Sequence, residues 1–517
     1  MSTSQRIIKN TLFLYIRMAI SILVNIFTTR ILLEALGASD YGLYNVVGGA
    51  IAMLGFVTSS MSSTTQRFIS YAEGEGNFDK IKSIFANALI VHYGVALFTA
   101  VLLIFAGLVF FNGILNIPEG REGSAILIYG CMVFSTVFSI TVVPYDASLN
   151  AHENMKIYSS IGIADVLFKL LIAVTVFYFD SDRLILYGVL MALESWFVRL
   201  ITQQYCKKHY SECQDLCLQK LYEKNTIREM TSFAGWNMIE IFSSMVSLYG
   251  MSLIVNHFFG TELNAALGIA TQLAGVLMGI SMNMIKAITP ILVKREGMHQ
   301  REQMLELSYV GCKFSYLSLS FFCIPVIFYI NEILDIWLYD VPVYTSVFCQ
   351  IFVISNLIEQ LSRLLYQTIM ARGHIQKYNI VRSIANIMPI ILSVFMLKFW
   401  TFPPYWILLN WLLWRVLIGG MINVFYANKE VGLSVGSFLK RVVNVCALTS
   451  LTVIFFNVCL VLLQEFFFHK SIFFFFISII ISIPIYWYIS ISKQEKYLIV
   501  GFVKNKSLMK KSVLFNR

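Results

Sequence analysis

The sequence predicts an all-α membrane protein with about fourteen transmembrane helices, arranged as two pseudo-symmetric six-helix lobes plus a C-terminal helix hairpin. Of its 517 residues, 58% are hydrophobic and only 13% are charged, and a soluble domain could not bury that much apolar surface. Its apolar runs repeatedly reach about 20 residues, the length that a helix needs to cross roughly 30 Å of hydrocarbon. Stretches of the first half also recur in the second half.

The recurrence concerns an N-terminal apolar hairpin and a later helix junction. The connector ALGASDYGLYNV reads against IVNHFFGTELNAALGI, which places Gly37 opposite Gly260. The stretch PYDASLNAHENMKIYSSI, beginning at Pro144, reads against LLYQTIMARGHIQKYNIV, beginning at Leu364. Two matches at nearly the same spacing, each at a helix end, indicate a duplicated lobe of about six helices.

The apolar runs define the individual helices. The first run is interrupted by Arg17 and no small-residue cleavage site follows it, so we expect a transmembrane helix there rather than a signal peptide. No connector is long enough to hold a folded domain. The fourteen helices are expected near residues 8–31, 41–62, 82–111, 124–144, 157–179, 184–205, 233–256, 265–290, 305–330, 344–370, 377–398, 403–427, 440–463 and 472–492.

These helices suggest four parts of the chain. The expected parts are an N-terminal lobe at 1–205, a charged cytoplasmic linker at 206–231, a C-terminal lobe at 232–428, and a hairpin with a basic tail at 429–517. The end of the tail is mildly amphipathic, which fits either a helix on the anionic inner leaflet or a disordered segment.

The basic residues predict the orientation. The net charge is +10, and 26 of the 39 lysine and arginine residues fall in segments that face the cytoplasm if the N-terminus does, against four on the other side. Loops rich in lysine and arginine stay inside, so both termini are expected in the cytoplasm. Because the basic residues follow the loops, they indicate topology and not a nucleic-acid partner.

Several classes of chemistry find no support in the sequence. No Walker or HExxH motif occurs, so we expect neither an enzyme nor a bound cofactor, and an ATP-driven pump would need its motor on another chain. Cys206, Cys213 and Cys217 lie near His209, but their spacing fits no common zinc pattern and no metal site is expected.

Charged residues inside the predicted helices are the candidate functional residues, because such groups usually face a partner or a wet cavity. Asp165 and Lys169, and Glu359 and Arg363, are spaced i,i+4 with the acid first. This spacing indicates an ion pair on one helix face. The spacing leaves open whether the basic residue of each pair also binds a substrate. It also leaves open whether the acidic residue lines the cavity or binds a coupling ion.

Two arginines are the strongest candidates. Arg17 and Arg415 lie near mid-membrane with no acid three or four residues away, so we expect them to line a water-filled cavity. Glu240 also lacks a local partner and could pair with one of them, and Glu194 is a further candidate acid. A cavity with a net positive lining suits an anion, especially a diphosphate, because guanidinium offers a planar fork of donors.

Other cations lie close enough to the predicted cytoplasmic helix ends for their side chains to reach the headgroup region. They are Arg199, Lys286, Lys313 and Arg382.

The sequence resembles the bacterial polysaccharide and O-antigen flippases, the polysaccharide transporter branch of the multidrug/oligosaccharidyl-lipid/polysaccharide exporter superfamily. The resemblance rests on RILLEALGASDYGLYNV, QRFISYAEGEGNFDKIKSIF and SLNAHENMKIYSSI, and on the six-plus-six-plus-two plan. It spans essentially the whole chain, although its motifs are specific to the superfamily more than to one substrate.

The resemblance implies two six-helix bundles that alternate between inward- and outward-open states in the inner membrane. The implied cargo is a polyprenyl-diphosphate-linked oligosaccharide, the implied diphosphate ligands are cavity arginines, and Arg17 matches that pattern. Glycosyltransferases and a polymerase of the same pathway are possible partners, and membrane lipid is the surrounding medium. The coupling ion, Na⁺ or H⁺, stays open.

Two other functions remain as alternatives. A cation-coupled multidrug and toxin extrusion transporter would carry coupling carboxylates in its lobes; the first helix has none, while Glu240 and Asp165 keep that reading open. A glycan polymerase or ligase would need a sizeable periplasmic loop, and the longest predicted outside connector has only about a dozen residues.

Overall fold

The computed structural model describes residues 3–52, 54–114, 117, 120–216, 221–338, 340–466, 473–493 and 495–496. These residues form α-helices with short 3₁₀ and π-helical turns and include no β-strand. Twelve helices within this part of the chain are long and apolar enough to cross a membrane. The predicted all-α polytopic class is therefore confirmed, with a number of spans close to the fourteen expected.

Two of the predicted spans are not among the twelve. The run at 41–62 is divided between α1 (Thr3–Ala52) and α2 (Gly55–Glu75). The run at 344–370 does form a helix, α12 (Thr345–Arg372), but its polar and charged side chains make it less apolar than the spans that are counted.

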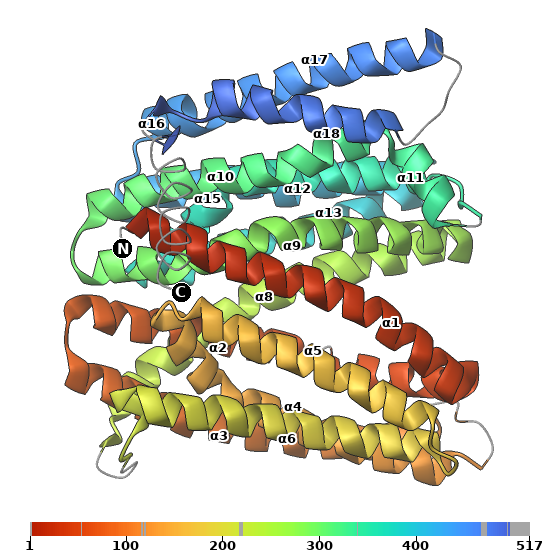
Figure 1. Ribbon diagram of the computed structural model, residues 1–517, viewed down its shortest axis with the longest axis vertical. Coiled ribbons are helices and arrows are strands. Elements are labelled where there is room, and N and C mark those ends of the chain that lie inside the picture. The colour runs from red at the N-terminus through yellow and green to blue at the C-terminus, as the bar shows by residue number, and fades with distance from the viewer. Residues whose placement is uncertain are drawn as a thin grey trace, which may run out of the picture. The chain divides into compact units, whose positions relative to one another are not determined.

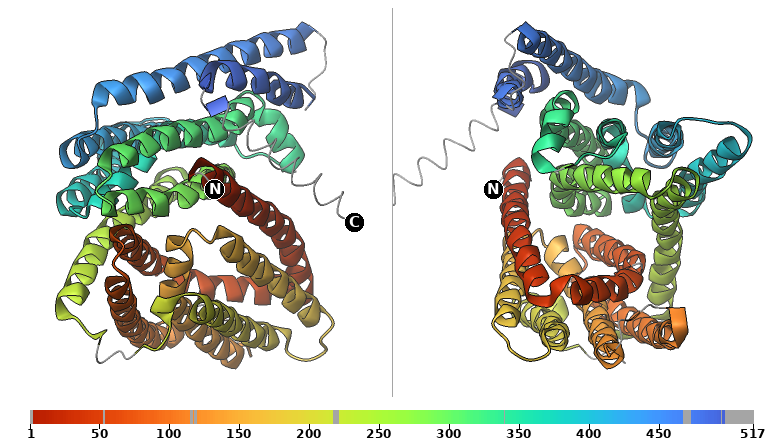
Figure 2. Two further views of the ribbon diagram at one scale, coloured as in Figure 1. Left: turned by 60° about the vertical axis from the view of Figure 1, so that its left-hand side comes forward. Right: turned by 90° about the vertical axis from the view of Figure 1, so that its right-hand side faces the viewer.

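The break in α1 lies inside the connector expected between the first two apolar arms. Gly37 has φ 73° and ψ 166° there, a conformation that is essentially restricted to glycine. The apolar span accordingly ends at Gly37. Figure 2 shows the two arms of α1 meeting at an angle at this point.

Residues with positive φ recur at matching places in the two halves of the sequence. The pairs are Gly37 and Gly260, Gly76 and His299, and Glu153 and Gly373. Members of the first two pairs are 223 residues apart and members of the third are 220 apart. Since residues other than glycine rarely adopt positive φ, the repeated spacing supports the duplicated plan.

The helices gather into two compact units, each of which is described separately. The N-terminal unit comprises Leu12–Ile241 and Val293–Gln300, and the C-terminal unit comprises Met1–Thr11, Phe242–Leu292 and Arg301–Arg517. The division passes through α8 (Lys224–Phe259) and close to the end of α9 (Thr261–Gly297). The lobe boundaries expected from the sequence stay predictions.

In the N-terminal unit, α4 is the central helix and lies beside α2, α3 and α6. Its beginning contributes Ile128 to one apolar cluster and its end contributes Leu149 to another. The remaining elements are α3 (Phe78–Val109), η1 (Phe110–Ile114), α4 (Glu122–Ala151), α5 (Met155–Phe177), α6 (Arg183–His209) and η2 (Ser211–Cys213).

In the C-terminal unit, α10 and α12 lie side by side, and α17 and α18 form the expected hairpin against α10 (Figure 1). The short amphipathic helix α11 and the π-helical turns are not predicted from the sequence. The elements are α10 (Arg301–Phe328), α11 (Ile330–Trp337), α13 (Gln376–Phe399), α14 (Tyr405–Trp411), η3 (Leu412–Ile418), α15 (Gly419–Val431), α16 (Val435–Phe438), η4 (Leu439–Val443), α17 (Asn444–Phe466), α18 (Phe473–Ile485) and η5 (Tyr486–Ser490).

The side chain of Lys313 pairs with an acid that lies far from it in the sequence. It is 8% exposed, and its Nζ lies 2.6 and 2.7 Å from the two carboxylate oxygens of Glu495. A non-local acid therefore neutralises this cation inside the C-terminal unit. The basic end of the tail, beyond residue 496, lies outside the described residues.

A network of charged side chains joins helix ends on the predicted cytoplasmic side of the N-terminal unit. His152 lies between two carboxylates, with Nε2 2.7 Å from Glu212 Oε1 and Nδ1 3.4 Å from Glu73 Oε1. Lys294 donates to the same Glu73 oxygen (2.8 Å) and to Glu153 (3.1 Å). The network fixes the α4–α5 junction relative to η2 and the end of α2.

The network makes the stability of this unit dependent on pH. Burial alone would lower the pKa of His152, but its hydrogen bonds to Glu212 and Glu73 outweigh burial and raise the pKa to about 9. A histidine pKa that is raised on folding contributes stability fully below the unfolded value, about 6.5, and loses it as the pH rises through about 9.

We expect His152→Gln to flatten the loss of stability of the purified protein between pH 7 and pH 9.5. The histidine contribution lost over that range is on the order of 2 kcal/mol. The measurement is thermal unfolding of wild type and variant at a series of pH values. The control is His374→Gln, because the His374 side chain is 73% exposed. Equal pH slopes for wild type and His152→Gln would contradict the assignment.

Candidate functional site

Four candidate residues meet in the N-terminal unit. Arg17 of α1, Asp165 and Lys169 of α5, and Glu194 of α6 form what we call the N-terminal group, in which the charge of Arg17 acts on Asp165. Lys169 Nζ lies 2.8 Å from Asp165 Oδ1, so the ion pair indicated by their i,i+4 spacing is present. The three helices thus bring two cations and two carboxyl groups together.

Arg17 packs against Tyr158 and Gly162 of α5. Its guanidinium carbon lies 4.7 Å from the centroid of the Tyr158 ring, close enough for a cation–π interaction. One turn further on, a Cβ on Gly162 would overlap the guanidinium. The arginine therefore occupies a slot that exists because Gly162 has no side chain.

Asp165 and Glu194 form a carboxyl pair. The two side chains interact with each other, and a hydrogen bond between two carboxyl groups would take one proton. Glu194 is only 7% exposed, whereas Asp165 faces the cations Lys169 and Arg17. With one proton bound, the group carries two positive charges and one negative charge.

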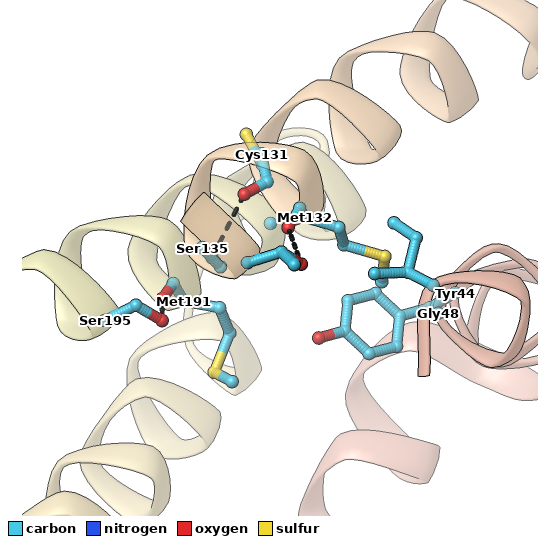
Figure 3. A pocket seen from close by; sticks show the side chains of 10 residues that line it. Tyr44, Gly48, Cys131, Met132, Ser135, Met191 and Ser195 are labelled. Atoms are coloured by element: carbon cyan, nitrogen blue, oxygen red, sulfur yellow. Dashed lines mark hydrogen bonds between the residues drawn. The ribbon is translucent and has the colours of Figure 1, made fainter. Parts of the chain in front are cut away.

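A cavity of about 270 Å³ lies near this group between α1, α4 and α6. Figure 3 shows Tyr44 from α1 facing Cys131, Met132 and Ser135 of α4 and Met191 and Ser195 of α6. Serine hydroxyls that line this cavity donate hydrogen bonds to backbone carbonyls one helical turn earlier. Ser135 Oγ, for example, donates to the carbonyl oxygen of Cys131 (3.0 Å). A second cavity of about 210 Å³ shares Ile51, Ser135 and Thr136 with the first. Neither cavity is lined by a predicted site residue.

A second set of charged residues meets in the C-terminal unit. Glu359 and Arg363 of α12, Arg382 of α13 and Arg415 of η3 form the C-terminal group, and all three arginines act on the Glu359 carboxylate. Arg363 Nη1 lies 2.6 Å from Glu359 Oε1, so this predicted i,i+4 ion pair is also present. Three guanidinium groups here share one carboxylate.

Hydroxyl and aromatic groups hold the Arg415 side chain. Its Nη1 donates to Ser244 Oγ at 2.6 Å, and its guanidinium carbon lies 5.2 Å from the Trp411 ring. Its backbone carbonyl accepts a 2.9 Å hydrogen bond from Arg382 Nη1. Arg415 is therefore held at both ends, by a serine and by a second arginine.

Arg382 differs from the sequence-based expectation. Its side chain is 5% exposed and does not reach out to the headgroup region. Instead it passes over Gly419, where a Cβ would overlap its guanidinium, and ends on the carbonyl of Arg415. The position of Arg382 along α13 does not predict these two contacts, because both come from a segment more than 30 residues later in the sequence.

The remaining predicted residues do not form the two ion pairs described above. Glu240, on α8, is partly exposed and belongs to neither of the two ion pairs above. Arg199, on α6, lies 5.2 Å from the ring of Phe138. No cluster of histidine, cysteine and acidic residues suited to a metal ion occurs within the described ranges; there, Cys206 and Cys213 are buried, while Cys217 lies outside them.

The two groups differ in electrostatic character. The N-terminal group contains as many carboxyl groups as cations and can exchange a proton. The C-terminal group contains three arginines and one glutamate. Arginine side chains offer planar forks of donors that suit an anionic ligand.

The fold is that of known membrane transporters. The structure is similar to an outward-facing multidrug resistance MATE family transporter of the MOP superfamily, with a TM-score of 0.71, 9% identity, and coverage of 83% of this chain and 98% of that one. It is similar to MATE in the straight conformation, with a TM-score of 0.71, 10% identity, and coverage of 84% and 96%.

A third similar structure is a MOP superfamily transporter from Pyrococcus furiosus, whose description reports a binding pocket of reverse polarity and suggests a different function. The TM-score is 0.70, the identity 9%, and the coverage 85% of this chain and 99% of that one. No protein-family model and no curated protein sequence matches the chain. At these identities the similarity establishes the fold.

The carboxyl pair generates a prediction about two isosteric variants. We expect Glu194→Gln to change the free energy of unfolding by less than about 0.5 kcal/mol, because an amide N–H can donate to Asp165 in place of the shared proton. Asp165→Asn is expected to destabilise by about 1 kcal/mol, because it leaves Lys169 without its carboxylate.

The measurement is unfolding of the purified protein in detergent at neutral pH, with both variants side by side. Lys169→Gln in the Asp165→Asn background is the control, and it should recover part of the lost stability. A larger loss for Glu194→Gln than for Asp165→Asn would contradict the assignment of the two carboxyl groups.

Proposed function

We propose that this protein is an inner-membrane exporter that moves a polyprenyl-diphosphate-linked oligosaccharide from the cytoplasmic to the periplasmic leaflet by alternating access. The cargo would be a repeat unit of O-antigen, capsule or exopolysaccharide, delivered by glycosyltransferases and passed to a polymerase. The proposal takes both termini to be cytoplasmic and assigns the protein no catalytic step.

The observation that carries this proposal is the charge of the C-terminal group. The guanidinium groups of Arg363, Arg382 and Arg415 all act on the Glu359 carboxylate, which is ion-paired with Arg363. A diphosphate diester carries two negative charges, and guanidinium binds phosphate oxygens through two parallel hydrogen bonds. A cationic drug would be repelled by the same group.

Arg17 is the second proposed diphosphate ligand. Its place over Tyr158 and Gly162 leaves the guanidinium within a group that becomes more positive when the carboxyl pair holds a proton. Lys169 adds a second cation at the same level. We therefore propose H⁺ as the coupling ion, bound between Asp165 and Glu194, so that protonation strengthens the attraction for an anion.

A second candidate function is cation-coupled multidrug and toxin extrusion. The observation that favours it is the carboxyl pair Asp165 and Glu194, since a cation exporter needs acids inside its lobes. The fold fits this function equally well. It does not account for the arginine excess of the C-terminal group, and for that reason it ranks second.

The test of the leading proposal is complementation of a strain that lacks this exporter. Deletion should cause lipid-linked oligosaccharide to accumulate on the cytoplasmic side, and the wild-type gene should relieve it. We expect Arg17→Ala and Arg415→Gln each to lower glycan export about tenfold or more, because each loses charge-assisted hydrogen bonds.

The control variant is Arg441→Gln. Arg441 forms a two-point ion pair with Glu306 (2.6 Å for each bond), but both side chains are about half exposed, so export should stay within about twofold of wild type. Normal surface glycan in Arg17→Ala and Arg415→Gln at normal membrane expression would overturn the proposal.

The same strains decide between the two functions. If deletion causes no accumulation, and expression of the protein instead confers resistance to cationic dyes, the extrusion function replaces the leading one. That resistance should then be lost in Glu240→Gln or Asp165→Asn, which remove candidate coupling acids, and should survive in Arg415→Gln.

A further inference from the structure

The π-helical turn η3 (Leu412–Ile418) interrupts an otherwise α-helical segment and contains Arg415 near its middle. In an α-helix the N–H of Gly419 would bond to the carbonyl four residues earlier, that of Arg415. Here it bonds to the carbonyls of Trp414 and Val416 instead. The turn therefore leaves the Arg415 carbonyl available to a donor from outside its own helix.

Arg382 of α13 is that donor. Its Nη1 lies 2.9 Å from the Arg415 carbonyl oxygen, and its burial shows that the side chain is enclosed along its length. A hydrogen bond from a charged donor contributes more than a neutral one, roughly 1.5–3 kcal/mol. The Arg382 bond thus holds the backbone of the turn at the residue whose side chain reaches Ser244.

Gly419 leaves the space through which the Arg382 side chain reaches the carbonyl of Arg415. A Cβ at this position would overlap Arg382 Nη1, whereas a Cβ at the adjacent Gly420 would lie 3.4 Å from Ser362 Oγ, an ordinary contact. The two neighbouring glycines therefore differ in what a methyl group would displace. Only at Gly419 would the methyl group push the guanidinium off the carbonyl of Arg415.

We propose that Arg382 and Gly419 are positioning residues for the diphosphate site, with Arg382 holding Arg415 through its carbonyl and Gly419 leaving room for that bond. This inference rests on the proposed function, in which Arg415 binds the diphosphate. Preorganisation of a ligand group by a second layer of buried contacts raises affinity because less order has to be imposed on binding.

The test measures binding of inorganic pyrophosphate to the purified full-length protein by calorimetry. Wild type should bind, and Arg415→Gln should define the background from other basic sites. Gly419→Ala and Arg382→Gln are each expected to weaken binding about tenfold. Gly420→Ala is the matched control and should stay within about twofold of wild type.

A double-mutant cycle separates positioning from general packing. In the Arg382→Gln background, Gly419→Ala should cause no further loss of pyrophosphate binding, because the group it displaces has already been removed. If the double variant instead weakens pyrophosphate binding by the product of the two single effects, Gly419 acts through helix packing. That result would overturn its role as a positioning residue. If Gly419→Ala does not fold, unchanged binding in Arg382→Gln overturns the inference by itself.

The outcomes also separate this inference from the function on which it rests. Wild type that does not bind pyrophosphate, or Arg415→Gln that binds like wild type, removes the proposed diphosphate site and the inference with it. Binding that is lost in Arg415→Gln but unchanged in Gly419→Ala and Arg382→Gln overturns only the positioning roles.

Discussion

Charge inside apolar helices is the constraint on which this structure depends. An ionised side chain in hydrocarbon is costly unless a partner compensates it, and the local partners are found within the same unit. Lys169 pairs with Asp165, and Arg363 pairs with Glu359. Besides these ion pairs, the N-terminal group contains a second carboxyl group and the C-terminal group contains two further arginines.

Glycine makes the remaining charges structurally possible, because a guanidinium group needs space that packed helices do not usually leave. Arg17 crosses α5 at Gly162, and Arg382 crosses at Gly419. The first arginine ends on an aromatic ring and the second on a carbonyl that a π-helical turn leaves available. In each unit the absence of one Cβ leaves room for an arginine side chain.

The sequence predicts the features that depend on local spacing. Apolar runs give the fold class and nearly all helices, and i,i+4 spacing gives both ion pairs. It does not predict partners that come from distant helices, such as Glu495 for Lys313 and the Arg415 carbonyl for Arg382. The π turn follows from tertiary packing, not from local propensity. Orientation and lobe boundaries remain predictions.

The duplicated plan shows how the two units came to differ. At the spacing of 220 residues that relates Glu153 to Gly373, Gly162 corresponds to Arg382, so one position supplies the gap in one unit and the guanidinium in the other. Glu359 likewise corresponds to Ser139, which lines a neutral cavity in the N-terminal unit. Backbone geometry is repeated while charge is not. Under the proposed function the carboxyl pair of the N-terminal unit binds the coupling proton while arginines of both units bind the diphosphate, so the repeated backbone carries two different side-chain chemistries.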